Sequence, residues 1–408
     1  MKLLKKLSIL IILFGMFSNS CYALESNNPY GVYCKLLVDL DCIRKNLNSI
    51  KENIGQNVQL MPVVKGKAYG TYATEVLSTF TECGISMLAV AKCSEGIELR
   101  QLGFTGEIVV LSQPFIEEIS NIIEYNLTPG VCYLEFLQQL EQNLKSQNKE
   151  LSVHLEIETG LGRTGIDTKD LLKFVELLKN CNHIRVEGAY THFASADSDE
   201  VYTNKQVNIF EESVRKLKEY FELKYIHMSS SAGVINVPTG ICNVVRPGLL
   251  VYGYLPDESM EGKVDIHPST KLISKISFIH KLKKGESCNY DQCFVAERDT
   301  IVGVLPIGYS IGIPRCFTGE VVINKTKVPI LGRVNMDNIM VDLTDLPEVS
   351  IGQEVCFWDN EVIKLSEYAK NSKAVCEGAL SVLSSQIPRV FERDLIQYIP
   401  EIGDSKRS

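Results

Sequence analysis

The body of the chain has no long run of basic residues. Its 408 residues include 42 lysines and arginines against 50 acidic residues, which gives a formal net charge of -8. Because binding to nucleic-acid phosphates needs clustered positive charge, this balance argues against nucleic acid as a partner. The chain also contains no internal repeat and no low-complexity segment.

The 13 cysteines form neither a close Cys-x-x-Cys pair nor a Cys/His cluster at metal-ligand spacing. A metal site is therefore not expected. We interpret most of these cysteines as small buried hydrophobic residues, although some could pair in an exported protein.

No apolar run is long enough to span a membrane, and the one at the N-terminus is typical of a secretory signal. Three lysines precede the apolar segment 7–17, which is well short of the ~20 residues that a spanning helix needs. A small-x-small sequence ending at Ala23 follows. We predict a signal peptide over residues 1–23 and an exported, periplasmic protein with no stable membrane insertion after cleavage. An uncleaved anchor is the alternative.

The remaining sequence has the composition of a globular protein, 45% hydrophobic and 23% charged, and is long enough for a barrel and a second domain. Between residues 34 and 265, apolar runs alternate with segments of helical periodicity. The eight predicted strands are 60–64, 87–91, 108–111, 127–131, 153–157, 186–191, 225–228 and 243–245. The predicted helices include 40–54, 134–145, 169–179 and 204–220. Eight such units predict a (β/α)8 TIM barrel.

After residue 265 the pattern changes to strand-like runs separated by Gly, Pro and Asn, with little helical periodicity. These runs are 272–280, 301–306, 320–323, 339–343 and 354–358. We predict a mainly β C-terminal domain over residues 266–400 and a disordered tail over 401–408. The predicted fold class is therefore α/β, a TIM barrel followed by a mainly β domain.

Polar residues follow several of the predicted barrel strands. Lys65 follows the first strand, Arg163 the fifth, His192 the sixth and Arg246 the eighth. Each alone is more often structural: a solvated lysine, a hydrogen-bonded histidine or an arginine in an ion pair. Together they predict an active site, because barrel enzymes assemble their sites at the carboxyl ends of the strands.

A phosphate site is predicted at the same end of the barrel. Ser231 follows the seventh strand, and the backbone N–H groups of Gly248 and Leu249 follow the eighth. Barrels commonly bind phosphate at these two positions.

Several motifs resemble those of the alanine racemase family. Residues 63–70, Val-Val-Lys-Gly-Lys-Ala-Tyr-Gly, resemble the family's cofactor-lysine motif. The other motifs, in the family's order, are Arg246-Pro247-Gly248, Asn289-Tyr290-Asp291, Pro306-Ile307-Gly308-Tyr309, Gly332-Arg333-Val334-Asn335-Met336-Asp337 and Ile387-Pro388-Arg389. The resemblance covers residues 33 to 395. It implies an enzyme that uses pyridoxal 5'-phosphate (PLP) to interconvert L- and D-alanine, and a homodimer with shared active sites.

The resemblance also implies catalytic roles. Lys65 binds PLP covalently and acts as a base on one face of the α-carbon, and Tyr290 of the partner subunit acts on the other face. Racemisation needs two opposed groups because a proton removed from one face must return to the other. Arg246 faces the pyridine nitrogen, keeps the ring neutral and weakens the electron sink. His192 resembles the residue that links Arg246 to the catalytic tyrosine.

The remaining implied contacts concern the cofactor and the substrate. Tyr69, Ser231, Gly248 and Leu249 resemble the family's phosphate-binding residues, and Arg163 supports the phenolate oxygen of PLP. Arg163, Met336 and Asp337 are assigned to substrate binding, with Tyr309 at the entrance to the substrate channel. Lys67 is the alternative to Lys65 as the cofactor lysine, since both would lie on one strand face. The Lys-x-x-Ala-Tyr-Gly spacing favours Lys65.

Three positions depart from the family pattern. Thr71-Tyr72 replaces the usual His-Gly. Glu156 stands where many members carry a carbamylated lysine, and it offers the same charge on a shorter arm. Ser385, assigned to cofactor binding, replaces a phosphate-contacting tyrosine, which predicts a wider pocket.

The substrate range stays open at this point. Ser385 and the export signal resemble features of the periplasmic broad-specificity racemases, which act on serine, lysine or methionine. Gly162-Arg163-Thr164, however, follows the alanine racemase form.

Two further readings are less favoured. PLP-dependent decarboxylases place an acidic residue at the pyridine nitrogen, so Arg246 argues against them. Non-catalytic PLP-binding barrels typically lack the β-domain, so residues 266–400 argue against that class.

Overall fold

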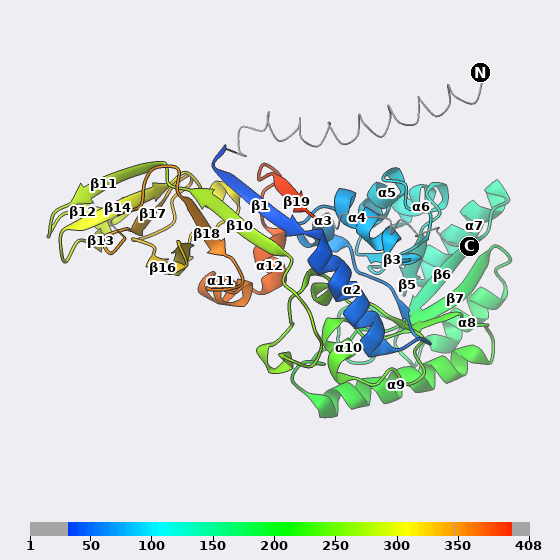
Figure 1. Ribbon diagram of the computed structural model, residues 1–408. Coiled ribbons are helices and arrows are strands. Elements are labelled where there is room, and N and C mark those ends of the chain that lie inside the picture. Colours follow the sequence, from blue (N-terminus) through cyan, green and yellow to red (C-terminus); the bar gives the residue numbers. More distant parts are fainter. Residues whose placement is uncertain (1–31, 347, 394–408) are drawn as a thin grey trace, which may run out of the picture.

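The structure is a computed structural model that describes residues 32–346 and 348–393 (Figure 1). A barrel with surrounding helices forms one half of the molecule, and an elongated β-rich domain extends from it. The predicted signal peptide and the predicted disordered tail lie outside the described residues. Among the residues described, no helix is both long and apolar enough to cross a membrane.

Eight parallel strands form the barrel and confirm the predicted fold class. Their order is β2-β9-β8-β7-β6-β5-β4-β3, and the two ends of this sheet meet through a bridge between Val63 and Ala89. In that bridge, Val64 N–H donates to the Ala89 carbonyl at 2.8 Å and Ala89 N–H donates to the Pro62 carbonyl at 2.9 Å. The strands are β2 (Gln59–Leu60), β3 (Met87–Val90), β4 (Glu107–Val110), β5 (Thr128–Val131), β6 (Leu151–Glu156), β7 (Ile184–Tyr190), β8 (Tyr225–His227) and β9 (Val244–Val245).

Helices alternate with these strands along the chain. They are α2 (Leu40–Ile54), α3 (Lys65–Tyr69), α4 (Ala73–Glu82), α5 (Cys93–Gln101), α6 (Ile119–Glu124), α7 (Leu134–Gln147), α8 (Leu171–Lys179), α9 (Glu200–Lys218) and α10 (Ser231–Asn236). Short 3-10 helices are η2 (Ile116–Glu118), η3 (Leu249–Tyr252), η4 (Glu258–Met260), η5 (Tyr290–Gln292) and η6 (Tyr309–Ile311).

Helix α2 coincides with the predicted segment 40–54 and illustrates why these segments are helical. The Asp39 side chain caps it by accepting from Cys42 N–H at 2.8 Å. Its apolar residues recur at helical spacing and are buried. Asn46 lies on that buried face and donates to the Val251 and His267 carbonyls, so the helix is fixed to the segment that leaves the barrel.

The β-rich domain contains a six-stranded sheet in the order β16-β15-β18-β10-β1-β19, a three-stranded sheet β11-β14-β17 and a hairpin β12-β13. The strands are β1 (Cys34–Asp39), β10 (Thr270–Lys275), β11 (Phe278–Leu282), β12 (Ser287–Cys288), β13 (Phe294–Val295), β14 (Thr300–Leu305), β15 (Glu320–Ile323), β16 (Thr326–Pro329), β17 (Ile339–Asp342), β18 (Glu354–Trp358) and β19 (Arg389–Glu392). Two helices, α11 (Leu365–Asn371) and α12 (Cys376–Ser381), accompany them.

The predicted start of the barrel at residue 34 is wrong. Strand β1 pairs with β10 in antiparallel fashion and with β19 in parallel fashion, so it belongs to the sheet of the β-rich domain. The predicted helix 40–54 directly precedes the first predicted barrel strand, 60–64, and no separate strand was predicted before it, which is why the predicted barrel domain starts at residue 34.

Two further details differ from the prediction for the C-terminal domain. The single predicted strand 272–280 is split between β10 and β11, which belong to different sheets. The helices α11 and α12 lie where little helical periodicity was expected, and both are short.

Candidate active site

Lys65 begins α3, which is a left-handed turn at the carboxyl end of the first barrel strand. Positive φ angles run through Gly66 (60°), Lys67 (56°), Ala68 (53°) and Tyr69 (54°). A left-handed helical conformation costs an L-residue about 1–2 kcal/mol, so the surrounding structure must hold this turn in place.

Glu95 of α5 holds the beginning of the turn. Its Oε1 accepts from Gly66 N–H at 2.7 Å, while its Oε2 accepts from the N–H groups of Ala91 and Lys92 at 2.9 and 3.0 Å. One carboxylate therefore fixes the lysine turn to the end of β3. The sequence analysis did not identify Glu95, because nothing in its local pattern distinguishes it from a solvated helix residue.

Arg389, from the C-terminal domain, holds the end of the turn. Its Nε donates to the Gly70 carbonyl at 2.8 Å, and its guanidinium lies 4.5 Å from the centre of the Tyr72 ring. Gly70 is itself confined, because a Cβ there would lie 2.3 Å from the Leu380 carbonyl oxygen. The β-rich domain thus participates in positioning Lys65.

Lys67 does not share a strand face with Lys65, so the geometric basis for that alternative is wrong. The left-handed turn separates the two side chains, and the Lys67 ammonium lies 5.4 Å from the centre of the Tyr72 ring. Burial and the positive charge of Arg163 lower the pKa of Lys65, which favours the neutral amine.

The carboxyl ends of β8 and β9 form a small cradle of hydroxyl and amide groups. The Ser231 Oγ accepts from Gly248 N–H at 3.1 Å and from Leu250 N–H at 3.3 Å. A Cβ at Gly248 would lie 2.0 Å from the Tyr69 hydroxyl oxygen, so only glycine permits this approach. Three predicted phosphate-binding residues are therefore brought together.

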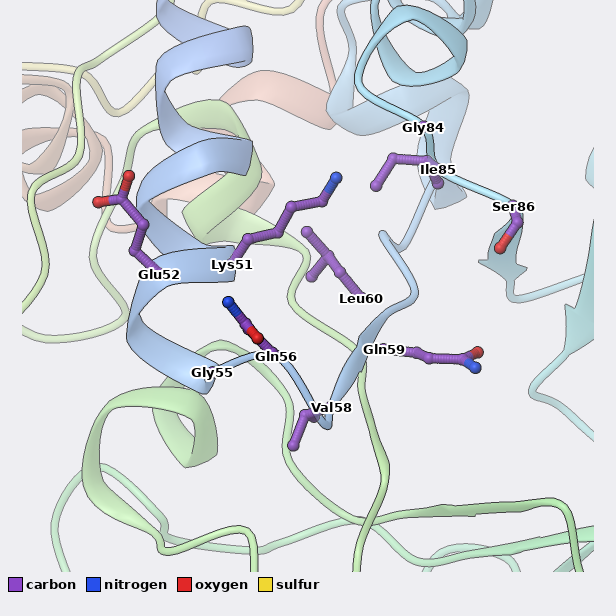
Figure 2. Close-up of a pocket in the computed structure, with 10 residues that line it drawn as sticks. All are labelled: Lys51, Glu52, Gly55, Gln56, Val58, Gln59, Leu60, Gly84, Ile85 and Ser86. Atoms are coloured by element: carbon purple, nitrogen blue, oxygen red, sulfur yellow. The ribbon is translucent and has the colours of Figure 1, made fainter.

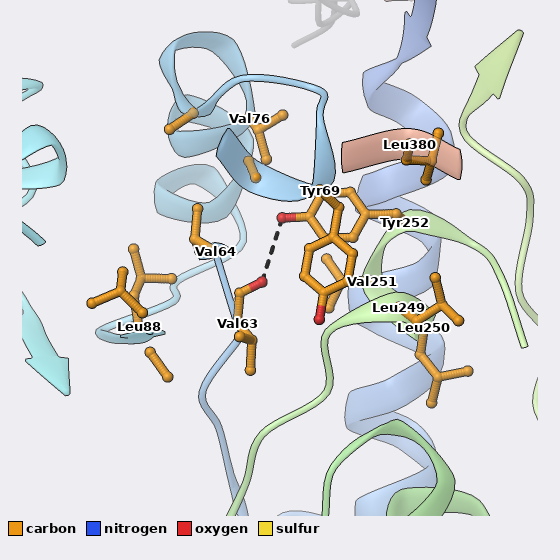
Figure 3. Packing of buried hydrophobic residues seen from close by; sticks show 14 of the residues in the cluster. Val63, Val64, Tyr69, Val76, Leu88, Leu249, Leu250, Val251, Tyr252 and Leu380 are labelled. Atoms are coloured by element: carbon orange, nitrogen blue, oxygen red, sulfur yellow. Dashed lines mark hydrogen bonds between the residues drawn. The ribbon is translucent and has the colours of Figure 1, made fainter. Parts of the chain in front are cut away.

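Buried apolar side chains pack around Tyr69, which is one of the residues of this cradle. The Tyr69 and Tyr252 rings lie 4.9 Å apart, and the Tyr252 hydroxyl donates to the Val63 carbonyl at 3.5 Å (Figure 3). Leu249 and Leu380 belong to the same buried cluster and come from the barrel and from α12 respectively. The phosphate-binding end of the site therefore rests on a rigid core.

Arg246 is buried and makes hydrogen bonds only to uncharged acceptors. Its Nη1 donates to Nδ1 of His227 at 2.7 Å, and its Nη2 donates to the carbonyls of Thr191 and Met228 at 2.7 and 3.2 Å. Its guanidinium also lies 5.4 Å from the centre of the Tyr190 ring. Burial lowers the pKa of Arg246 to about 10, so the side chain remains a cation at neutral pH.

His192 lies among the charges of the predicted site. Burial and the positive charges of Arg246, Arg163 and Lys65 lower its pKa to about 3. The structure therefore brings these four predicted residues together at one end of the barrel. The side chain that hydrogen-bonds Arg246 is His227 rather than His192. The sequence places His227 at the end of the seventh predicted barrel strand, in the same segment as Ser231, but assigns it no role.

Glu156, at the end of β6, faces the same region. Its Oε1 accepts from the Thr164 hydroxyl at 3.0 Å, and its buried Oε2 has no hydrogen-bond partner among the described residues. Burial raises the pKa of Glu156, whereas the charges of Arg163 and Arg246 act in the opposite direction. No hydrogen bond joins the side chains of Glu156 and Arg163, so the two interact through their charges alone.

Tyr290 lies on the loop of the β12-β13 hairpin, where its side chain is 64% exposed. Asn289 fixes this loop by donating to the Leu331 and Arg333 carbonyls at 3.2 and 2.7 Å. Arg333 in turn donates to Asp291 at 2.9 Å. Two sequence motifs that are far apart in the chain are thus joined.

The segment that carries Met336 and Asp337 packs in the same way against the segment that carries Tyr309. Tyr309 N–H donates to the Asn335 carbonyl at 3.0 Å, and the Ser310 hydroxyl donates to Asp337 at 2.8 Å. Met336 and Tyr309 are 54% and 37% exposed. Met336, Tyr309 and Tyr290 are therefore all exposed on the β-rich domain, and all three were predicted to belong to the site.

The two groups of predicted residues lie apart in a single chain. Figure 1 shows the β12-β13 hairpin at the end of the β-rich domain that is farthest from α3 and the barrel. Ser385 lies on an exposed loop after α12, and its side chain makes no hydrogen bond to the described residues. Its predicted contact with the cofactor stays a prediction.

A separate hollow of about 610 Å³ lies at the opposite, amino-terminal end of the barrel strands, between α2 and the residues before β3 (Figure 2). Its lining residues include Lys51, Gln56, Gln59 and Ser86. None of them belongs to the predicted site.

The residues at the carboxyl end of the barrel fit pyridoxal phosphate. The close approach at Gly248 brings the Tyr69 and Ser231 hydroxyls beside backbone N–H groups, which are the kinds of group that bind a phosphate. A lysine with a lowered pKa and a buried arginine stand at the same end. By class, the protein is therefore a PLP-binding enzyme of the barrel-plus-β type.

Comparison with known proteins identifies the family. Residues 38–256 match the model of the alanine racemase N-terminal domain, and residues 269–391 match that of the C-terminal domain. An alanine racemase from Treponema denticola is 35% identical over 374 residues, which covers 90% of this chain and 97% of the relative. An alanine racemase from Staphylococcus carnosus is 32% identical, covering 88% of this chain and 95% of the relative. The chain belongs to the alanine racemase family.

Solved structures agree with this assignment. An alanine racemase from Clostridium difficile has a TM-score of 0.85 at 30% identity and covers 88% of this chain and 96% of its own. The Bacillus anthracis alanine racemase with bound L-Ala-P has a TM-score of 0.83 at 31% identity, with 88% and 95% coverage.

Proposed function

We propose that this chain interconverts L- and D-alanine, with PLP held by Lys65 and with Tyr290 supplied by the partner subunit. The observation that carries the proposal is the position of Lys65 on a strained turn, at the same end of the barrel as the phosphate cradle and Arg246. The names of its relatives favour alanine over the broad-specificity alternative.

When bound, PLP supplies the electron sink that makes the α-proton of an amino acid removable. The Tyr69 hydroxyl, the Ser231 hydroxyl and the N–H groups of Gly248 and Leu249 would hold its phosphate. Arg246 would donate a hydrogen bond to the pyridine nitrogen. Because arginine retains its proton, the pyridine ring of PLP would stay neutral. A neutral ring is a weaker electron sink, which would limit side reactions that need a stronger one.

Two groups would move the proton. The neutral Lys65 amine takes the α-proton on one face of the substrate, and its lowered pKa favours this role. The phenol of Tyr290 would donate a proton to the opposite face. Arg163 and the Met336 N–H would bind the substrate carboxylate, with Asp337 beside them and Tyr309 at the channel entrance.

The homodimer is part of this proposal. Tyr290, Met336 and Tyr309 are exposed residues of the β-rich domain, and the β12-β13 hairpin that carries Tyr290 lies at the end of that domain farthest from α3. A second copy that placed this face over the barrel would complete both sites.

Export to the periplasm is a further part of the proposal, supported by the signal-like segment 1–23. Expression of the full chain followed by cell fractionation and N-terminal sequencing tests it. A mature protein beginning at Leu24 in the periplasmic fraction is expected, and an intact N-terminus in the cytoplasm would contradict export.

Solvent isotope exchange tests the catalytic proposal. In deuterium oxide, the purified protein with PLP should incorporate deuterium at the α-carbon of both alanine enantiomers and interconvert them. Release of carbon dioxide without racemisation would identify a decarboxylase instead. A visible cofactor band without exchange would identify a non-catalytic PLP-binding protein.

A further inference from the structure

A buried line of side chains runs through the barrel from Arg246 towards the other end of the strands. Nη1 of Arg246 lies 2.7 Å from Nδ1 of His227, and Nε2 of His227 lies 2.8 Å from Nδ1 of His154. Nε2 of His154 then faces Oε1 of Glu107 at 3.8 Å. Both histidines are fully buried, whereas the Glu107 side chain is 21% exposed near the start of β4.

The barrel is shaped around the inner histidine. A β-bulge interrupts the pairing of β6 with β7 at this point, because Val153 pairs with Val186 while His154 pairs with Gly188. A Cβ at Gly188 would lie 2.5 Å from the His154 ring, so only glycine leaves room for the imidazole. Bulges of this kind commonly re-aim a side chain near an active site.

Hydrogen-bond chemistry fixes the tautomers along this line. A guanidinium can only donate, so Nδ1 of His227 must accept and its proton must lie on Nε2. That proton is donated to Nδ1 of His154, which places the second proton on Nε2 of His154. This N–H points at the Glu107 carboxylate and has no hydrogen-bond partner of its own in the described part of the chain.

Both rings are uncharged at neutral pH. Burial lowers the pKa of His154 to about 3 and that of His227 well below its ordinary value. In this arrangement each imidazole presents its lone pair towards Arg246 and its N–H towards Glu107. The two ring dipoles therefore point in the direction that stabilises a cation at Arg246.

We propose that Glu107 is a remote positioning residue for Arg246, acting through the aligned tautomers of His154 and His227. The role of Arg246 at the cofactor rests on the proposed function, whereas the tautomer relay does not. Glu156 acts on Arg246 through its charge, but among the described residues no carboxylate hydrogen-bonds the guanidinium. An anion outside the cofactor pocket can balance the cation without competing for the pyridine nitrogen.

Burial raises the pKa of Glu107, whereas two hydrogen bonds favour its ionised carboxylate. The Thr128 hydroxyl donates to its Oε1 at 3.2 Å, and the Tyr225 hydroxyl also hydrogen-bonds it. Nearby charged groups include Arg100, Glu187 and Lys224, and the last two are joined to each other by a 2.7 Å salt bridge. Glu187→Gln separates charge from contact, because the charge of Glu187 also acts on His154, whereas the contact at Nε2 in the described part of the chain is with Glu107.

The test is ¹⁵N NMR of the histidine side chains in the cofactor-free protein, followed by kinetics of the holoenzyme. Wild type should show His154 and His227 as neutral rings with the proton on Nε2. Glu107→Gln should shift the His154 Nε2–H resonance and, more weakly, that of His227. It should also lower kcat about three- to tenfold with KM for alanine within about twofold, because only the tuning of Arg246 is changed. Glu107→Asp, which retains the charge, should restore much of kcat.

Several results would overturn the relay. They include a proton on Nδ1 of His154, a charged ring at neutral pH, or equal shifts in Glu107→Gln and Glu187→Gln. If the NMR pattern holds but the wild-type protein does not racemise alanine, the relay stands and the proposed function fails. If circular dichroism shows that Glu107→Gln is unfolded, the relay is tested with Glu107→Asp and Glu187→Gln instead. The measurement is again the position of the His154 and His227 Nε2–H resonances.

Discussion

The side chains of Lys65 and Lys67 leave the same short turn in different directions. Lys65 opens the turn with a lowered pKa, whereas the Lys67 ammonium lies against the Tyr72 ring. The motif spacing favoured Lys65 from the sequence. The left-handed turn that separates the two side chains could not be predicted, because it depends on Glu95 and Arg389, which are distant in sequence.

Lys65→Ala should abolish both racemisation and the visible absorption band of covalently bound PLP, because no other amine takes its place. Lys67→Ala should leave the band and retain most of the activity. Absorbance spectra and initial rates of the two variants, recorded side by side, provide the measurement. Loss of the band in Lys67→Ala alone would reverse the assignment.

Glu156 carries a carboxylate of its own, so activity should not depend on added bicarbonate. Glu156→Gln removes a buried charge that acts on Arg163, and we expect KM for alanine to rise about fivefold, equivalent to about 1 kcal/mol. Steady-state kinetics with and without bicarbonate check both statements. Glu150→Gln is the control, because this exposed carboxylate lies at the opposite end of the same strand. An unaffected Glu156→Gln variant would count against this role.

At the scale of elements, hydrophobic periodicity located all eight barrel strands, since each is a buried apolar run bounded by polar segments. Periodicity could not assign β1 to its sheet, because pairing with β10 and β19 involves residues more than 200 positions away. The inward-facing histidines of β6 and β8 were missed for a related reason. A single polar residue in an apolar strand gives no indication of what it faces across a barrel.

The buried histidines of the barrel, His154, His192 and His227, predict how stability depends on pH, because burial lowers the pKa of each. Burial lowers the pKa of His154 and His192 to about 3, whereas the unfolded chain titrates near about 6.5. Below that value the unfolded state binds protons that the folded state does not. The free energy of unfolding should therefore fall as pH decreases from about 6.5 towards about 3, by up to ~1.4 kcal/mol per pH unit for each histidine.

Urea unfolding at fixed protein concentration between pH 7.5 and 5.0 measures this slope, because carboxylates contribute little above pH 5. His154→Gln should make the slope shallower. His267→Gln should not change the slope, since the His267 side chain is 43% exposed. A wild-type free energy of unfolding that does not change across this range would contradict the prediction.

At the scale of the whole molecule, the sequence predicted a barrel followed by a mainly β domain, but not the separation between the barrel and the β12-β13 hairpin that carries Tyr290. Motifs show which residues belong together in the enzyme, whereas the fold shows that one chain cannot bring them together. Tyr290 and Lys65 are both exposed and lie on different domains, and the turn that carries each is fixed by its own set of hydrogen bonds. The proposed second subunit would complete the site without unfolding either domain.

Subunit mixing tests this shared site most directly. Lys65→Ala and Tyr290→Phe should each be inactive as homodimers, and an equal mixture after subunit exchange should regain about a quarter of wild-type activity. This value follows because half of the dimers are then mixed and each mixed dimer has one intact site of two. Mass spectrometry of differently tagged subunits would establish the exchange. Proven exchange with no recovered activity would contradict the shared site.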